Sequence, residues 1–216
     1  MQIDVWSDVV CPWCWLGNAR LENALAGFSH GEQVDVVFHS FELDPGEPVD
    51  RDIPTDQLLA TKFGVGPAQI DAMHDRLRAL GRAEGIDYQF QKARTSNTFE
   101  AHQILHLAAA RGKQPQMVAR LFRANFSEGV RVGDRIELVR LGAEVGLEAG
   151  EIEEALAERR YEQAVRDDEA EARAHGISGV PFFVADGRLA ASGAQSTEVL
   201  RALIEKAWST LATQGG

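Results

Sequence analysis

The sequence reads Ser7-Asp8-Val9-Val10-Cys11-Pro12-Trp13-Cys14-Trp15-Leu16-Gly17 where a predicted strand gives way to a predicted helix. The strand covers residues 2–6, because apolar and polar side chains alternate there. The helix runs on to about residue 28 with apolar residues at helical spacing. A second strand is predicted from Val34 to Leu43, before the turn Asp44-Pro45-Gly46. This β-α-β order predicts that the two strands are parallel neighbours.

Cys11 and Cys14 are the two cysteines of a 216-residue chain, and they stand three positions apart. Such a pair excludes a framework of structural disulfides and indicates redox chemistry. Cys11 is expected to attack a disulfide as a thiolate, and Cys14 to resolve the mixed disulfide that results. Pro12 suits the first position of a helix, which makes Cys11 the N-cap. We therefore expect the amides of Trp13 and Cys14 to point at the Cys11 sulfur and to lower its pKa from about 8.5.

Two other interpretations of the cysteine pair are open. Cys-x-x-Cys also forms half of many zinc sites, and His39, His102 and His106 could supply further ligands. However, the motif opens a helix after a strand, and the chain has no second cysteine pair. The other interpretation is two buried, reduced cysteines with no function. We predict a redox centre that needs neither a metal nor an organic cofactor.

The rest of the chain divides into a long helical stretch and a short β-hairpin. Helical patterns dominate residues 49–176, and Asp134 is placed to cap one of these helices. Residues 180–184 and 188–192 then form apolar runs across an Asp186-Gly187 turn, which predicts a hairpin. A final helix follows Ser196. The predicted class is α/β, with one half at 1–48, a helical insertion at 49–176 and a second half at 177–216.

Composition narrows the choice of partners. The chain holds 22 basic and 33 acidic residues, a formal charge of -11. Such a charge repels phosphate backbones, so nucleic acid is not an expected partner. No apolar run approaches the roughly 18 residues that a membrane span needs, so no membrane partner is expected. Residues 1–6 lack the features of a signal peptide, and we expect a cytoplasmic protein.

With these pieces placed, the chain resembles the DsbA family, and within it the cytoplasmic FrnE-like branch. The likeness covers nearly the whole chain and rests on four matches in order. They are the stretch Ser7 to Gly17, then Asn97-Thr98-Phe99-Glu100-Ala101-His102, then Leu121-Phe122 to Phe126 with Gly133-Asp134, and finally Gly179-Val180-Pro181-Phe182-Phe183-Val184 with Ser192-Gly193-Ala194-Gln195.

The resemblance implies a thioredoxin-like fold with a large helical insertion and an activity as a disulfide oxidoreductase or isomerase. It implies that the Val180–Pro181 bond is cis and lies beside the cysteines, where the backbone of Val180 and Pro181 binds the substrate. Pro12 and Trp13 are expected to contact the substrate as well, and the resemblance places His102 at the active-site cleft. Protein or small-molecule thiols and disulfides are the expected substrates, and glutathione is a candidate redox partner.

Two departures from the family keep alternatives open. Some FrnE-like proteins carry a second cysteine pair near the carboxy terminus, and this chain has none. The branch also resembles 2-hydroxychromene-2-carboxylate isomerases and kappa-class glutathione transferases, which use a serine where this chain has Cys11. A glutathione-dependent isomerase or transferase is therefore one alternative, and a holdase-like module that binds polypeptides is another. The oligomeric state is expected to be a monomer or a homodimer.

Overall fold

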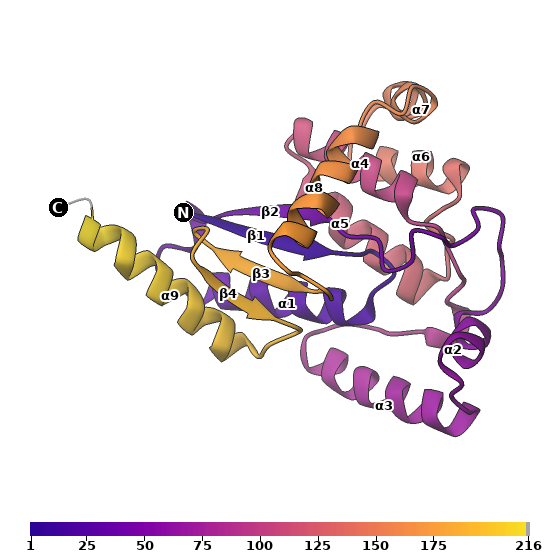
Figure 1. Ribbon diagram of the computed structural model, residues 1–216, viewed down its shortest axis with the longest axis horizontal. Coiled ribbons are helices and arrows are strands. Elements are labelled where there is room, and N and C mark those ends of the chain that lie inside the picture. The colour runs from indigo at the N-terminus through magenta and orange to yellow at the C-terminus, as the bar shows by residue number, and fades with distance from the viewer. Residues whose placement is uncertain (215–216) are drawn as a thin grey trace.

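The molecule is built on a four-stranded mixed sheet (Figure 1). A computed structural model describes residues 1–214 of the chain, with side chains up to residue 211. The strands are β1 (Gln2–Ser7), β2 (Asp35–Ser40), β3 (Phe182–Ala185) and β4 (Leu189–Ser192), in the order β2-β1-β3-β4. β1 and β2 are parallel, as predicted, whereas β3 pairs antiparallel with both β1 and β4. The second strand is shorter than predicted and ends at Ser40.

Two helices belong to the sheet halves of the chain. α1 (Pro12–Ala26) connects β1 to β2, and α9 (Thr197–Gln214) follows β4 and packs against α1. The predicted hairpin is confirmed, and its turn residues Asp186 and Gly187 have φ values of 54° and 63°. Both values belong to the left-handed region, and the loop between the paired Ala185 and Leu189 has three residues, 186–188.

The remaining helices lie between β2 and β3 in the sequence, which confirms the predicted helical insertion. They are α2 (Thr55–Phe63), α3 (Pro67–Ala83), α4 (Phe99–Ala110), α5 (Gln114–Arg123), α6 (Arg135–Glu144), α7 (Ala149–Ala157) and α8 (Glu162–Ala174). Short 3-10 helices occur at Gly31–Gln33 and Phe90–Lys92, and a short π-helix at Ala124–Glu128 extends α5. Asp134 caps α6, since its carboxylate accepts from the amide of Ile136 at 2.9 Å. The domain boundaries given above stay a prediction.

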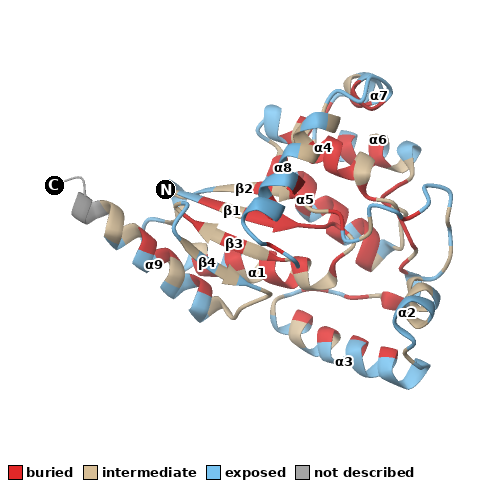
Figure 2. Ribbon diagram, in the orientation of Figure 1, coloured by how far each residue is buried: buried red, intermediate tan, exposed pale blue. Residues whose placement is uncertain are grey.

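One hydrophobic core joins the sheet to the insertion. Buried positions extend from β1 and α1 into α4 and α5 (Figure 2). Val5 and Leu16 on the sheet side belong to the same cluster as Leu121 and Leu141 in the insertion. Removing this apolar surface from water is the main favourable term in folding, so the two parts stabilise each other. Within residues 1–214, no helix combines the length and the apolar composition that crossing a lipid bilayer requires.

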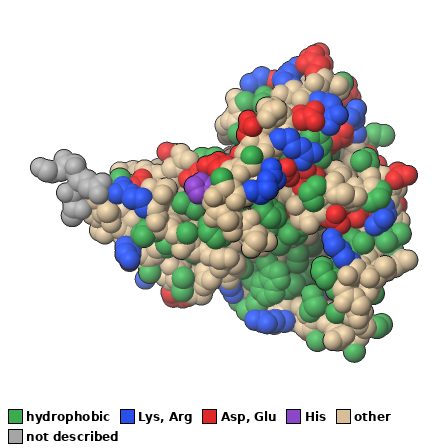
Figure 3. Space-filling model, in the orientation of Figure 1, with side chains coloured by type: hydrophobic (Ala, Val, Ile, Leu, Met, Phe, Trp, Pro, Cys, Tyr) green, Lys and Arg blue, Asp and Glu red, His purple; other side chains and the backbone are tan. Residues whose placement is uncertain are grey.

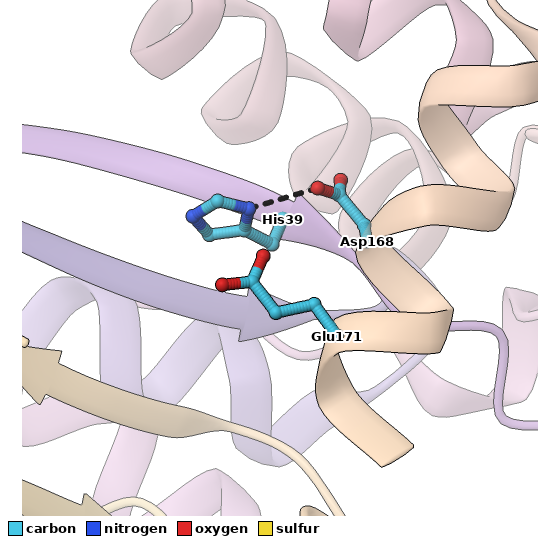
Figure 4. A group of neighbouring side chains, drawn as sticks. All are labelled: His39, Asp168 and Glu171. Atoms are coloured by element: carbon cyan, nitrogen blue, oxygen red, sulfur yellow. Dashed lines mark hydrogen bonds and ion pairs between the residues drawn. The ribbon is translucent and has the colours of Figure 1, made fainter. Parts of the chain in front are cut away.

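Ion pairs fasten α8 to the edge of the sheet. His39 on β2 has its Nδ1 2.9 Å from Asp168 on α8 and its Nε2 2.9 Å from Asp4 on β1. Figure 4 shows Asp168 and Glu171 reaching from α8 toward this histidine. The other oxygen of Asp168 accepts from the amide of Ser40 at 2.7 Å. The insertion is thus held to β1 and β2 by polar contacts as well as by the core.

The charges in this contact are mutually stabilising. Burial alone would lower the pKa of His39, but its hydrogen bonds to Asp168 and Asp4 and their negative charges outweigh burial and raise it. Burial would likewise raise the pKa of Asp168, but hydrogen bonds from His106, His39 and the Ser40 amide hold it well below its usual range. At neutral pH Asp168 is therefore ionised, and its charge favours the protonated form of His39.

The raised pKa of His39 predicts a pH-dependent contribution to stability. A histidine whose pKa is higher in the folded state stabilises fully below its unfolded pKa of about 6.5, and the gain is lost as pH rises through the folded value. The free energy of unfolding of the wild type should therefore exceed that of His39→Gln most below pH about 6.5. Urea unfolding between about pH 5 and 9 measures this. A difference that does not change with pH would contradict the assignment.

Candidate functional site

The cysteine motif lies where the loop after β1 enters α1. Cys11 is the N-cap residue with an extended backbone, and Pro12 opens the helix. The amide of Cys11 donates to the carbonyl of Asp8 at 3.0 Å, and the amide of Cys14 donates to the carbonyl of Cys11 at 3.0 Å. Both cysteines are unpaired and almost fully buried. The loop and the first helical turn therefore fix both sulfur-bearing residues through their backbones.

The expectation that helix amides point at the Cys11 sulfur is wrong for this structure. No amide of the first turn donates to that side chain. The carbonyl oxygen of Cys11 takes the amide of Cys14 at 3.0 Å and that of Trp15 at 3.3 Å instead. The Sγ atom of Cys11 lies 3.7 Å from the carbonyl oxygen of Val180, and the Cys11 thiol donates a hydrogen bond to this oxygen. The helix dipole still favours negative charge at this end of α1.

The Val180–Pro181 segment lies directly beside the motif, and its peptide bond is cis, as the resemblance implied. This proximity depends on Gly17 in α1. A Cβ atom at residue 17 would lie 2.9 Å from Cγ of Pro181 and 3.1 Å from the ring of Phe183. Only a residue without a side chain allows the proline to come this close. The structure thus brings Cys11, Val180 and Pro181 together, although about 170 residues separate them in sequence.

The two cysteines have different surroundings. Burial raises the pKa of the Cys14 thiol well above its usual value, and the neighbouring Cys11 raises it further, while hydrogen bonds from Ser7 and the Asp8 backbone oppose this only in part. Cys14 is therefore a protonated thiol at neutral pH. Its side chain is hydrogen-bonded to that of Cys11, and this contact favours the neutral form of Cys14. This asymmetry matches an attacking Cys11 and a resolving Cys14.

Aromatic residues of the helical insertion contact the first turn of α1, which carries the cysteine motif. Tyr88 donates its hydroxyl to the carbonyl of Pro12 at 2.5 Å. Trp15 packs against Tyr88 and stacks on Phe126 at 5.8 Å between ring centroids. Trp13 is half-buried, with the guanidinium of Arg76 5.7 Å from its ring. Figure 3 shows hydrophobic side chains gathered in a hollow between α1 and α3, on the same side of the molecule.

His102 does not reach the cleft in this structure. Its side chain is fully buried, and its Nε2 lies 3.5 Å from a carboxylate oxygen of Asp8, which is also fully buried. Asp8 in turn accepts from the amide of Leu43 at 2.8 Å and that of Val10 at 3.4 Å. His102 therefore lies beneath the cysteine loop, where it can support the loop but cannot contact a substrate.

The sequence did not point to Tyr88 or to Asp8. Tyr88 belongs to no motif, and only the path of the chain brings it to Pro12. Asp8 stands three residues before Cys11, and only the folded structure brings it to His102. Neither contact is local in sequence, so no periodicity could have predicted it.

A group of metal-ligating side chains lies away from the cysteines. His39, Asp168 and Glu171 bring three donor atoms within 4.8 Å of one another, among the residues that the structure describes. Both ring nitrogens of His39 are already engaged by Asp168 and Asp4. His39 and Asp168 are accounted for by the ion pairs that fasten α8, and Glu171 pairs with His175, so we assign no chemistry to the group.

Three comparisons place this geometry among known proteins. The profile of the DSBA-like thioredoxin domain matches residues 2–205. A probable DsbA oxidoreductase from Streptomyces coelicolor is 41% identical in sequence and superposes with a TM-score of 0.92, over 97% of this chain and 90% of that one. The uncharacterized protein YwbO of Bacillus subtilis is 30% identical over 85% of this chain and 86% of its own length. A 2-hydroxychromene-2-carboxylate isomerase, 16% identical, shares the fold with a TM-score of 0.68 over 100% of this chain and 98% of that one.

The contact at Gly17 generates a stability prediction. Gly17→Ala should lower the free energy of unfolding by about 1–3 kcal/mol, because the new methyl group has no room beside Pro181. Gly150→Ala is the matched control, since a Cβ there meets open space. That control should be neutral or slightly stabilising. Chemical denaturation of both variants measures the difference, and equal stabilities would contradict the close packing.

The protonation of Cys14 generates a second prediction. Brief treatment of the reduced protein with iodoacetamide near pH 7 should alkylate Cys11 before Cys14, because a thiol held protonated is a poor nucleophile. Peptide mapping by mass spectrometry identifies the modified residue. In a Cys11→Ser variant, Cys14 should react more slowly than Cys11 does in the wild type. Preferential modification of Cys14 would refute the assignment of roles.

Proposed function

Because the chain belongs to the family of DSBA-like thioredoxin domains, we propose that it is a dithiol–disulfide oxidoreductase and isomerase acting through Cys11-Pro12-Trp13-Cys14. One observation carries the proposal. Cys11 stands at the start of α1 with its sulfur 3.7 Å from the carbonyl of Val180, next to the cis Pro181, while a protonated Cys14 lies one turn behind it. A nucleophile and a resolving thiol thus meet the backbone of the half-buried Val180 and the buried Pro181 at one place.

The reaction follows from the two sulfur atoms. The Cys11 thiolate attacks one sulfur of a substrate disulfide, forms a mixed disulfide and releases the other substrate sulfur as a thiolate. Cys14 then loses its proton and attacks the Cys11 sulfur, which closes the Cys11–Cys14 disulfide and releases the second substrate sulfur. The substrate gains two electrons and the enzyme loses two. The reverse sequence oxidises a dithiol, and a mixed disulfide that is attacked by another substrate cysteine gives isomerisation.

The segment at Val180 and Pro181 is the proposed docking site for the substrate backbone. Val180 is half-buried, so its backbone can face a substrate that lies across Cys11. Pro12 and Trp13 are also half-buried and flank the attacking sulfur on the helix side. A substrate chain would therefore lie between the start of α1 and the strand that begins at Phe182.

The setting of the enzyme is also a proposal. We place it in the FrnE-like branch and in the cytoplasm, with glutathione as the source of electrons that restores the dithiol. The chain has no second cysteine pair that could relay electrons, which favours a diffusible thiol in that role. Its substrates would be protein or small-molecule thiols and disulfides.

The test is a paired cysteine experiment. The reduced wild type should reduce a model disulfide with glutathione as the electron donor. Cys11→Ser should lose this activity by a factor of about 100 or more, because the remaining thiol, Cys14, is buried and held protonated. Cys14→Ser should retain attack but accumulate a mixed disulfide that mass spectrometry detects. Turnover that survives Cys11→Ser would sink the proposal.

The same variants separate the alternatives. If the protein is a glutathione-dependent isomerase or transferase, the Cys14→Ser variant should keep the full rate of that reaction. The Cys11→Ser variant should lose it, because one nucleophile suffices. A holdase-like module would suppress aggregation of an unfolded client equally well after both cysteines are replaced. Turnover in the wild type that requires both cysteines is the outcome that distinguishes the proposed enzyme from both.

A further inference from the structure

An arginine of the insertion lies over the tryptophan of the cysteine motif. Arg76 on α3 is exposed, and its guanidinium is 5.7 Å from the ring centroid of Trp13. Trp13 stands between Cys11 and Cys14 and is half-buried. Two residues of chain span at most about 7 Å, so Trp13 has its Cα within that distance of the Cα of Cys11. Arg76 is therefore a cation at the edge of the active site, and the proposed disulfide exchange does not use it.

Arg76 has no carboxylate partner. Among the residues that the structure describes, it forms neither an ion pair nor a hydrogen bond. Other arginines of the insertion, such as Arg78, Arg111 and Arg140, each pair with a carboxylate. The residues three and four positions away from Arg76, which share its face of the helix, are all apolar: Ala72, Met73, Ala79 and Leu80. The charge of Arg76 is thus not neutralised by a neighbour on its own helix.

The contact with Trp13 leaves the hydrogen-bonding edge of the guanidinium available. A guanidinium stacks on an aromatic ring through its flat face, and its five N–H donors lie in its plane. Such an edge can bind a carboxylate through two parallel hydrogen bonds. Met73, one turn before Arg76, is 47% exposed and adds apolar area to the same face of α3. The hollow between α1 and α3 in Figure 3 is likewise lined by hydrophobic side chains.

We propose that Arg76 selects protein substrates that carry an acidic side chain next to the reacting cysteine, and that this carboxylate binds the free edge of the guanidinium. Apolar parts of the same substrate segment would pack on Trp13 and Met73. A polypeptide fits this surface better than a small polar thiol does, because apolar area lies beside the cation. The inference rests on the proposed disulfide exchange at Cys11 and adds the sequence context that the enzyme prefers.

The charge of the whole chain separates this proposal from a general electrostatic effect. With a formal charge of -11, the molecule as a whole attracts basic substrates and repels acidic ones. A preference for acidic residues beside the substrate cysteine therefore requires a local cation that outweighs the overall charge. The local and the overall effect predict opposite orders of reactivity.

The test uses three short peptides with one cysteine, activated as mixed disulfides with the neutral chromogenic thiol 2-thiopyridine. The residues on both sides of the cysteine are aspartate, asparagine or lysine, and the rest of the peptide is the same. Each rate is divided by the rate with 2-mercaptoethanol, which corrects for the intrinsic reactivity of the disulfide. The reduced wild type should favour aspartate over asparagine in kcat/KM by about three- to fivefold, the range for one exposed ion pair. Lysine should be the poorest of the three.

Variants of Arg76 locate the effect. Arg76→Gln should bring the ratio of aspartate to asparagine rates to one or below, and Arg76→Glu should make the lysine peptide the best of the three. Arg82→Gln is the matched control, because Arg82 is exposed on the same helix but lines a separate pocket with Asp87 and Gln89. It removes the same charge and should keep the ratio. An aspartate preference that survives Arg76→Gln, or a lysine preference in the wild type, would overturn the inference.

The two proposals fail in different ways. If the enzyme releases 2-thiopyridine from all three peptides at one normalised rate, disulfide exchange stands and the inference about Arg76 is wrong. If none of the peptides reacts, the proposed function fails and the inference fails with it. If Arg76→Gln slows reduction of the oxidised enzyme by glutathione but leaves the peptide ratios unchanged, the carboxylate that Arg76 binds belongs to glutathione, and the inference about protein substrates is overturned.

Discussion

The site depends on the close approach of Pro181 to Gly17. Because residue 17 has no side chain, the segment before β3 can lie against the first turns of α1, with Pro181 2.9 Å from where a Cβ would stand. This contact brings the carbonyl of Val180 to the Cys11 sulfur across about 170 residues of sequence. It also lets Phe183 enter the core fully buried beneath α1. The reactive cysteine and the backbone that faces it thus become one surface only when both halves of the chain have folded.

The helical insertion holds the same surface from the opposite side. Tyr88 bonds to the carbonyl of Pro12, Trp15 packs among aromatic rings of the insertion, and Asp168 fastens α8 to β1 and β2 through His39. The core continues through both parts, so loss of either would expose apolar surface of the other. Cys11 and Cys14 themselves lie in the sheet half of the chain, at the start of α1.

Much of the fold was predictable because its signals are local. The alternation in β1, the Pro12 start of α1, the cap at Asp134 and the Asp186-Gly187 turn each act over a few residues, and each is confirmed. α2 falls within the predicted helical stretch, but its bounds were not predicted, because none of its residues is buried and it carries no apolar stripe. The contacts of Tyr88 and the burial of His102 beneath Asp8 depend on tertiary packing that no spacing encodes. The expected amide contacts to the Cys11 sulfur were wrong: no amide donates to that side chain, and the amide of Cys14 donates to the Cys11 carbonyl.

The central claim is that Cys11 and Cys14 interconvert between a dithiol and a disulfide as one two-electron couple. Equilibration of the protein in glutathione buffers of graded potential, followed by acid quenching and mass spectrometry, measures this directly. We expect a single transition between the dithiol and the intramolecular disulfide within the range of about -120 to -270 mV spanned by related redox proteins, with a tenfold change in their ratio per about 30 mV. A protein that forms only a mixed disulfide with glutathione, or that stays reduced across the whole range, would contradict it.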